Sequence, residues 1–236
     1  MTFTAALKRI LAVAGAVAAF VAISSAQDFT IHFKTDAGAE GSTYYVSANA
    51  IRKVSPGLSD VIYRIDRGTI IYLDDRAKTY DEVSAAEAHE KIVSGMANLD
   101  PQKKAMLHQM GLDAAPQLTR IGPGETIAGF PTEEYSLKTG MAQGELWITQ
   151  ALQFPAGYYR DFNLLLGVSG PFGDAGKIAE VHGVVLKRAM TGAMGRGMNA
   201  TGEAAVSVER GPVPASIFEP PSDFKKVAGR QHADLK

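Results

Sequence analysis

Three methionines near the end of the chain are spaced so that they could bind a metal ion. Met190, Met194 and Met198 follow one another at intervals of four residues, and their thioether sulfurs are soft ligands that suit Cu(I). A helix would place these sulfurs on one face, but glycines stand between the methionines and glycine disfavours helix. The segment therefore predicts a flexible hairpin tip between Thr191 and Gly202, and we expect no metal site.

Serine and carboxylate side chains are not grouped as catalysis requires. Ser169 lies in a glycine-flanked segment, but it follows a predicted helix, whereas the exposed serine of a hydrolase links a strand to a helix. Asp74 and Asp75 fall in a predicted hairpin turn, and Glu133 and Glu134 point to opposite faces of a predicted strand. Because no nucleophile, base and orienting group come together, the sequence predicts a protein that is not an enzyme.

Composition argues against metal, cofactor and nucleic-acid chemistry. The five histidines are never two or four residues apart, the spacing with which a strand or a helix would build a metal site. The absence of cysteine from the sequence excludes disulfides and thiolate ligands. With 24 Lys+Arg, 25 Asp+Glu and a net charge of -1, the chain lacks the basic patch of a nucleic-acid binder. We therefore expect neither a cofactor nor a nucleic-acid partner.

Most of the chain alternates apolar and polar residues, as is typical of strands with one buried face. Short polar turns such as Asp66–Gly68 separate these stretches, which predicts an antiparallel meander. The predicted strands cover residues 29–34, 44–54, 61–65, 70–73, 117–121, 126–130, 133–138, 145–149, 181–190 and 204–210.

Capping signals mark helices between these strands. Ser84 and Glu87 form a capping box, and Asp100 with Pro101 begins a second helix that ends at Gly111. Apolar residues at helical spacing predict a third helix from Gly157 to Leu166. The expected fold is therefore α+β, a curved antiparallel sheet with the helix pair from Ser84 to Gly111 packed on one face.

The first 26 residues have the composition of a secretory signal peptide. Lys8 and Arg9 precede an apolar stretch from Ile10 to Ile23, which is shorter than the roughly 20 residues that a bilayer-spanning helix needs. Small residues then lead to a cleavage site after Ala26. We expect a periplasmic or extracellular mature chain without a transmembrane segment, in which residues 27–229 form one domain and residues 230–236 a flexible tail.

Three stretches of the sequence carry a pattern of their own. They are Val61–Tyr80, Ile127–Tyr135 with Glu145–Thr149, and Pro214–Pro220. Together they resemble the secreted bacterial domain of unknown function 4412 family, and the resemblance spans most of the chain after Ala26. It implies a fold similar to periplasmic carriers of the LolA and LppX kind, a half-barrel whose concave face is covered by helices. None of the three stretches has catalytic residue types at fixed spacing.

Methionine and aromatic side chains are concentrated on the predicted helices. Flexible thioethers repack around varied apolar partners at little cost, so these side chains could line a site for a lipid, an acyl chain or a lipoprotein segment. They could equally fill the core of a structural or protein-interaction protein of the envelope that holds no small ligand. Residue types do not separate these two interpretations, and they leave the oligomeric state open. The candidate ligand-binding residues are Met96, Met106, Met110, Tyr158, Phe162 and Leu166.

Overall fold

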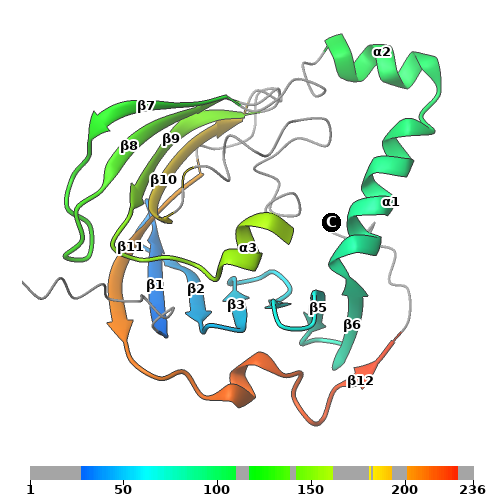
Figure 1. Ribbon diagram of the computed structural model, residues 1–236, viewed down its shortest axis with the longest axis horizontal. Helices are drawn as coiled ribbons and strands as arrows, with labels where there is room; N and C mark the ends of the chain where they lie inside the picture. The colour runs from blue at the N-terminus through cyan, green and yellow to red at the C-terminus, as the bar shows by residue number, and fades with distance from the viewer. Residues whose placement is uncertain are drawn as a thin grey trace, which may run out of the picture.

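The described part of the chain forms one open sheet of twelve strands with few helices (Figure 1). The computed structural model describes residues 28–109, 117–138, 142–161, 181, 183–192 and 201–227. The strand order is β12-β6-β5-β4-β3-β2-β1-β11-β10-β9-β8-β7. Neighbouring strands run antiparallel, except that β12 runs parallel to β6. The predicted antiparallel sheet is confirmed except for the parallel pair of β12 and β6, and the sheet stays open because β12 and β7 are its two edges.

The first six strands form a meander in which each strand pairs with the next. Their side chains alternate as the sequence predicts, so that Phe29, Ile31 and Phe33 are buried while the residues between them are not. The strands are β1 (Phe29–Thr35), β2 (Glu40–Val46), β3 (Ala50–Val54), β4 (Val61–Arg64), β5 (Thr69–Asp74) and β6 (Thr79–Ser84).

One predicted strand of the meander is in fact two. The sequence predicts a single extended stretch from Tyr44 to Val54, whereas the chain turns between β2 and β3. Ser47 makes this turn, since its hydroxyl accepts a hydrogen bond from the amide of Ala50 at 3.1 Å and from that of Asn49 at 3.4 Å. A serine that bonds to nearby backbone competes with an extended ladder.

The remaining long strands continue the sheet from the other side of β1. The predicted closing hairpin is confirmed by the pairing of β10 with β11. The strand predicted from Thr126 to Phe130 is wrong, because Ala128 and Gly129 both have positive φ angles and turn the chain sharply between Ile127 and Phe130. These strands are β7 (Gln117–Pro123), β8 (Glu133–Lys138), β9 (Ala142–Thr149), β10 (Val184–Gly192) and β11 (Thr201–Arg210).

The described helices are α1 (Ala85–Ala97), α2 (Pro101–Gln109) and α3 (Ala156–Asp161). Both predicted caps are confirmed: the Ser84 hydroxyl accepts from the amide of Glu87 at 3.4 Å, and the Asp100 carboxylate accepts from the amide of Lys103 at 2.8 Å. The predicted end of the second helix at Gly111, and the part of the third helix beyond Asp161, lie outside the described residues.

The predicted packing of the helix pair on the sheet is not confirmed. The chain passes directly from β6 into α1, whose first residue, Ala85, is buried. In contrast, α2 has no buried residue, and it lies away from the sheet (Figure 1). A helix without a buried side chain gains little from packing, so α2 contributes little to holding the pair against the sheet.

Two different segments cover the two faces of the meander. Around α3, the ring of Tyr158 lies 5.5 Å from that of Tyr63 on β4, and we call this side of the sheet the α3 face. The opposite side, the strap face, is covered by residues 211–227, the C-terminal strap. The strap contains a short 3₁₀ helix, η2 (Ala215–Phe218), and β12 (Lys225–Lys226), which pairs with β6.

The strap is fixed to the sheet by apolar and charged contacts. Phe218 and Phe224 are buried in a cluster that includes Ile62 and Ile71. The Arg64 guanidinium donates to the carbonyl of Phe218 at 3.3 Å and also pairs with two carboxylates, that of Asp66 in the turn between β4 and β5 and that of Glu219 in the strap. The hydrogen bonds to Asp66, the larger effect, and to Glu219 raise the pKa of Arg64 above its ordinary value.

The predicted signal peptide, residues 1–26, and the predicted tail, residues 230–236, lie outside the described residues. Among the helices that the structure describes, none is both long enough and apolar enough to cross a membrane.

Candidate functional site

Tyr158, one of the predicted ligand-binding residues, lies at the centre of an aromatic cluster on the α3 face. Only 3% of its surface is exposed, and its ring centroid is 4.8 Å from that of Phe154. Phe154 in turn lies 6.3 Å from Phe29 and 6.2 Å from Tyr44 on the sheet. Tyr159 connects the cluster to the start of β10, because its hydroxyl donates to the carbonyl of Gly183, the residue before that strand, at 2.6 Å. Around Tyr158, then, the interior is packed.

The other predicted ligand-binding residues are not placed beside Tyr158. Met106 lies on α2 with 52% of its surface exposed. Met96 belongs to α1, but its side chain is outside the described part of the structure, as are residues Met110, Phe162 and Leu166 entirely. A ligand-binding role for these six residues stays a prediction.

A charged pair lies on the α3 face, and the sequence patterns did not reveal it. Arg188 of β10 and Glu203 of β11 stand directly opposite one another, with 3.0 Å between guanidinium nitrogen and carboxylate oxygen. Glu203 is only 7% exposed, and it also accepts a hydrogen bond from the Ser42 hydroxyl at 3.2 Å. A buried carboxylate needs such partners, because desolvation of the charge is otherwise costly.

Lys53 on β3 adds a second cation to this region. It stands opposite Tyr44 of β2, and its ammonium nitrogen lies 5.6 Å from the centre of the Tyr44 ring. Lys53 is half-buried, and burial lowers the pKa of its ammonium, an effect that the positive charge of Arg188 increases. Alternation could have revealed its orientation, since Lys53 shares a face with buried Ile51.

Two apolar clusters flank these charges on the α3 face. One contains Ile31, Ile51 and Tyr63 together with the aromatic residues around α3. The other, over β8 to β10, contains Tyr135, Leu137, Leu146 and Ile148. Leu146 stands opposite Arg188 in the pairing of β9 with β10, so the Arg188–Glu203 pair lies between the two clusters.

The tyrosines of the α3 face are unsuited to acid–base catalysis near neutral pH. Burial raises the pKa of Tyr44 to about 12 and that of Tyr63 and Tyr158 further above the ordinary value of 10.0. All three hydroxyls are therefore protonated at neutral pH, and a general base would need a pKa near the operating pH. This face can bind a molecule through apolar contacts, charge and hydroxyl donors.

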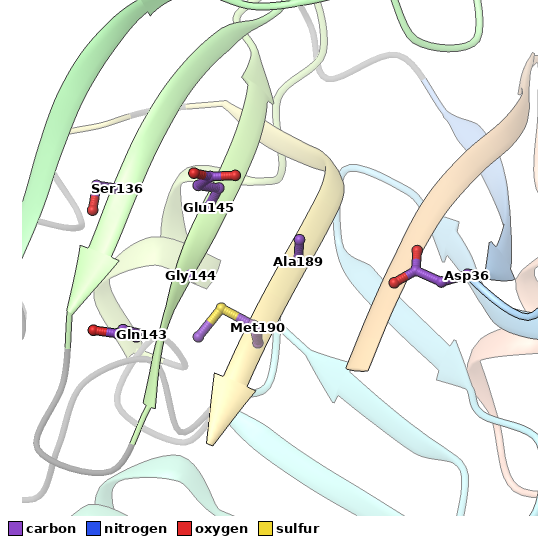
Figure 2. A pocket seen from close by; sticks show the side chains of 7 residues that line it. All are labelled: Asp36, Ser136, Gln143, Gly144, Glu145, Ala189 and Met190. Carbon is purple, nitrogen blue, oxygen red and sulfur yellow. The ribbon is translucent and has the colours of Figure 1, made fainter. Parts of the chain in front are cut away.

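A pocket of about 350 Å³ lies over β8, β9 and β10 (Figure 2). Ser136, Glu145 and Ala189 stand opposite one another in these strands, and because Ala189 follows Arg188, they point away from the α3 face. The Asp36 carboxylate packs directly on Gly202, where a β-carbon would lie 1.8 Å from one of its oxygens. The lining residues are Asp36, Ser136, Gln143, Gly144, Glu145, Ala189 and Met190.

The chemistry of this pocket differs from that of the α3 face. Asp36 and Glu145 give it two negative charges, and its lining includes neither a cation nor a histidine. Such a lining repels anions. Met190, the first of the three regularly spaced methionines, lines the pocket, whereas Met194 and Met198 lie outside the described residues. Within the described residues, no group of three or more His, Cys, Asp or Glu side chains is placed to hold a metal ion.

Comparison with known proteins identifies some structures of similar shape but does not assign the chain to a family. No family model matches the sequence, so the resemblance to the domain of unknown function 4412 family stays a prediction, and no curated protein matches it either. An uncharacterized conserved protein from Thermus thermophilus is similar in structure, with a TM-score of 0.49 and 11% identity over 86% of this chain and 91% of that one.

Two further solved structures are similar over the same share of this chain. PNGF-II has a TM-score of 0.45 and 11% identity, and the match covers 86% of this chain but 31% of that chain, about a third of its length. MucB, solved in complex with MucA(peri), has a TM-score of 0.39 and 13% identity over 86% of this chain and 57% of that one. Neither a family nor a function follows from these likenesses.

Proposed function

We propose that this chain is a non-enzymatic binding protein of the cell envelope that holds a lipid or acyl chain on the α3 face. In this proposal the sheet acts as a half-barrel and the α3 face is its concave side. The observation that supports the proposal is the placement of charged groups between two apolar clusters. Arg188 and Glu203 are held beside Leu146 on one side and close to Ala205 and Phe33 on the other.

This arrangement is costly unless it serves binding. Glu203 is the buried member of the pair, whereas the Arg188 side chain is 43% exposed at the edge of the face. Replacing a buried charge by a hydrophobic residue of similar volume is often neutral or stabilising, so a fold alone gains little from the carboxylate of Glu203. A site for an amphipathic molecule needs both an apolar surface and a few polar groups that orient the ligand. The α3 face provides both.

Adjacent tyrosines on β2 give a matched test. Tyr44 contacts the aromatic cluster around α3, whereas Tyr45 packs against the apolar cluster of the strap face, on the other side of the sheet. Both tyrosines are half-buried. We expect wild-type protein to bind a fluorescent long-chain fatty acid saturably, and Tyr44→Ala to weaken this binding about tenfold, which corresponds to roughly 1.4 kcal/mol. Tyr45→Ala should leave the affinity within about twofold.

Fluorescence titration measures the affinities, native mass spectrometry identifies lipid that co-purifies, and urea denaturation shows that both variants fold. Equal effects of the two substitutions would place the binding site elsewhere. An absence of uptake by the wild-type protein would contradict the proposal.

The dense packing around Tyr158 supports a second candidate, a structural or protein-interaction protein of the envelope with a filled interior. This candidate predicts no acyl uptake by the wild-type protein, and Tyr44→Ala would then change stability alone.

A further inference from the structure

We infer that the ligand of the α3 face is an acyl chain with an anionic head group, and that Lys53 binds this head group. This inference rests on the proposed function and specifies the chemistry of its ligand. It is carried by the position of the Lys53 ammonium at the border between the aromatic cluster and the Arg188–Glu203 pair.

The surroundings of Lys53 are apolar and aromatic on the sheet. Its neighbours across the ladder are Tyr44 on β2 and Val61 on β4. The ring of Tyr44 lies 5.6 Å from that of Phe33 and 6.2 Å from that of Phe154. The ammonium group therefore stands beside the half-buried ring of Tyr44 at the edge of the aromatic cluster, where the head group of an acyl chain packed against that ring would lie.

Among the described residues, no carboxylate is left to pair with the Lys53 ammonium. Glu203 is the nearby carboxylate, but it already pairs with Arg188 at 3.0 Å and accepts from Ser42 at 3.2 Å. No carboxylate of the described part of the chain forms an ion pair with Lys53. Among the described residues, Lys53 and Arg188 thus share one carboxylate, which gives this corner of the face a net positive charge.

Within the part of the chain that the structure describes, the other buried carboxylate of the α3 face is too distant to serve. Asp81 on β6 stands opposite Tyr72 on β5, which stands opposite Val61 on β4, the neighbour of Lys53. Adjacent strands are about 4.8 Å apart, so the backbone of Asp81 lies roughly 14 Å from the backbone of Lys53 along this row of three strand spacings. A carboxylate or phosphate on the ligand would supply the missing charge, and charge-assisted hydrogen bonds of this kind are stronger than neutral ones.

The test compares a long-chain fatty acid with the fatty alcohol of the same chain, which differs only in the charge of its head group. We expect wild-type protein to bind the acid about tenfold more tightly than the alcohol, a preference typical of one charge-assisted hydrogen bond. Lys53→Gln should reduce this preference to within about twofold while leaving the affinity for the alcohol unchanged. Lys53→Arg should keep the preference.

Lys34 is the matched control, because it is an exposed lysine on β1, two strands away from β3, that alternates with the buried residues of the α3 face. Lys34→Gln should leave both affinities unchanged. Equal affinities of the wild-type protein for acid and alcohol would overturn the inference while leaving the proposed function intact. An equal loss of both ligands in Lys53→Gln would also overturn it, and an absence of binding to either ligand would overturn both proposals.

Discussion

At the scale of single residues, Lys53 carries a free-energy cost in the unliganded protein. A half-buried ammonium next to Arg188 loses hydration and meets a like charge, which is why its pKa is lower than that of a free lysine. Residues that are kept in place for binding commonly reduce stability. The same side chain should therefore weaken the fold and strengthen the binding of an anionic ligand.

Replacing this charge with an apolar side chain of similar length should stabilise the protein. We expect Lys53→Met to raise the free energy of unfolding at pH 7 by on the order of 1 kcal/mol, as measured by urea denaturation without ligand. Because the pKa of Lys53 is lower in the folded state, the unfolded chain binds more protons near that pKa, so wild-type stability rises with pH toward the ordinary lysine value of 10.5. The advantage of Lys53→Met should shrink over that interval.

A wild-type protein that is more stable than Lys53→Met at pH 7 would show that the ammonium has a favourable partner in solution. Lys34→Met is the control, since the Lys34 side chain is exposed and its replacement should change stability by less than about 0.5 kcal/mol.

Sequence patterns point to Tyr158 but not to Lys53, Arg188 or Glu203, and the reason is physical. Tyr158 belongs to a run of aromatic residues whose burial follows from their size. A single lysine in a strand is exposed in most proteins, and whether it faces inward depends on which neighbouring residues share its side of the sheet. The partnership of Ser42 with Glu203 joins positions 161 residues apart, which no local pattern reveals.

At the scale of secondary-structure elements, the sequence was sufficient to predict an element wherever interactions among neighbouring residues determine its structure. The capping box at Ser84 and the aspartate at position 100 start their helices as predicted, because a cap bonds to amides two or three residues away. The stretch from Thr126 to Phe130 was predicted as a strand on composition, but its centre turns at Gly129. The strand β12 could not be predicted, because its two lysines are extended only through pairing with β6.

The C-terminal strap should contribute strongly to stability through its buried aromatic residues. Phe218 is 4% exposed and packs with Ile62, Ile71 and Leu73 on the strap face. We expect Phe218→Ala to lower the free energy of unfolding by about 3–5 kcal/mol, the cost of truncating a packed phenylalanine, as measured by urea denaturation.

Leu58, which is 65% exposed, provides the control, and Leu58→Ala should change stability by less than about 0.5 kcal/mol. If Phe218→Ala were as mild as Leu58→Ala, the strap would not form part of the cooperative fold. Fatty-acid affinity should be unchanged in Phe218→Ala under conditions where it remains folded, because the strap covers the face opposite the proposed site.

At the scale of the whole molecule, the proposed envelope location depends on processing of the first 26 residues. We expect the exported protein to begin at Gln27, since the residues before it have the small side chains that signal peptidases accept. N-terminal sequencing of the secreted or periplasmic fraction measures this directly. Recovery of an intact Met1 from that fraction would contradict the prediction, and an Ala26→Lys variant, which blocks the cleavage site, should accumulate unprocessed chain.

The pairing of β1 with β11 at the middle of the sheet joins segments from opposite ends of the described chain. Contacts of such high sequence separation form slowly, because a long loop must close before they contribute any stability. A chain that emerges into a compartment from its N-terminus can complete the β1–β6 meander early, but the free edge of β1 stays unpaired until β11 has arrived. During that interval the meander exposes a template for strand pairing with other chains. The order in which the strands are connected therefore leaves the free edge of β1 without a strand partner until Thr201–Arg210 has been added to the chain.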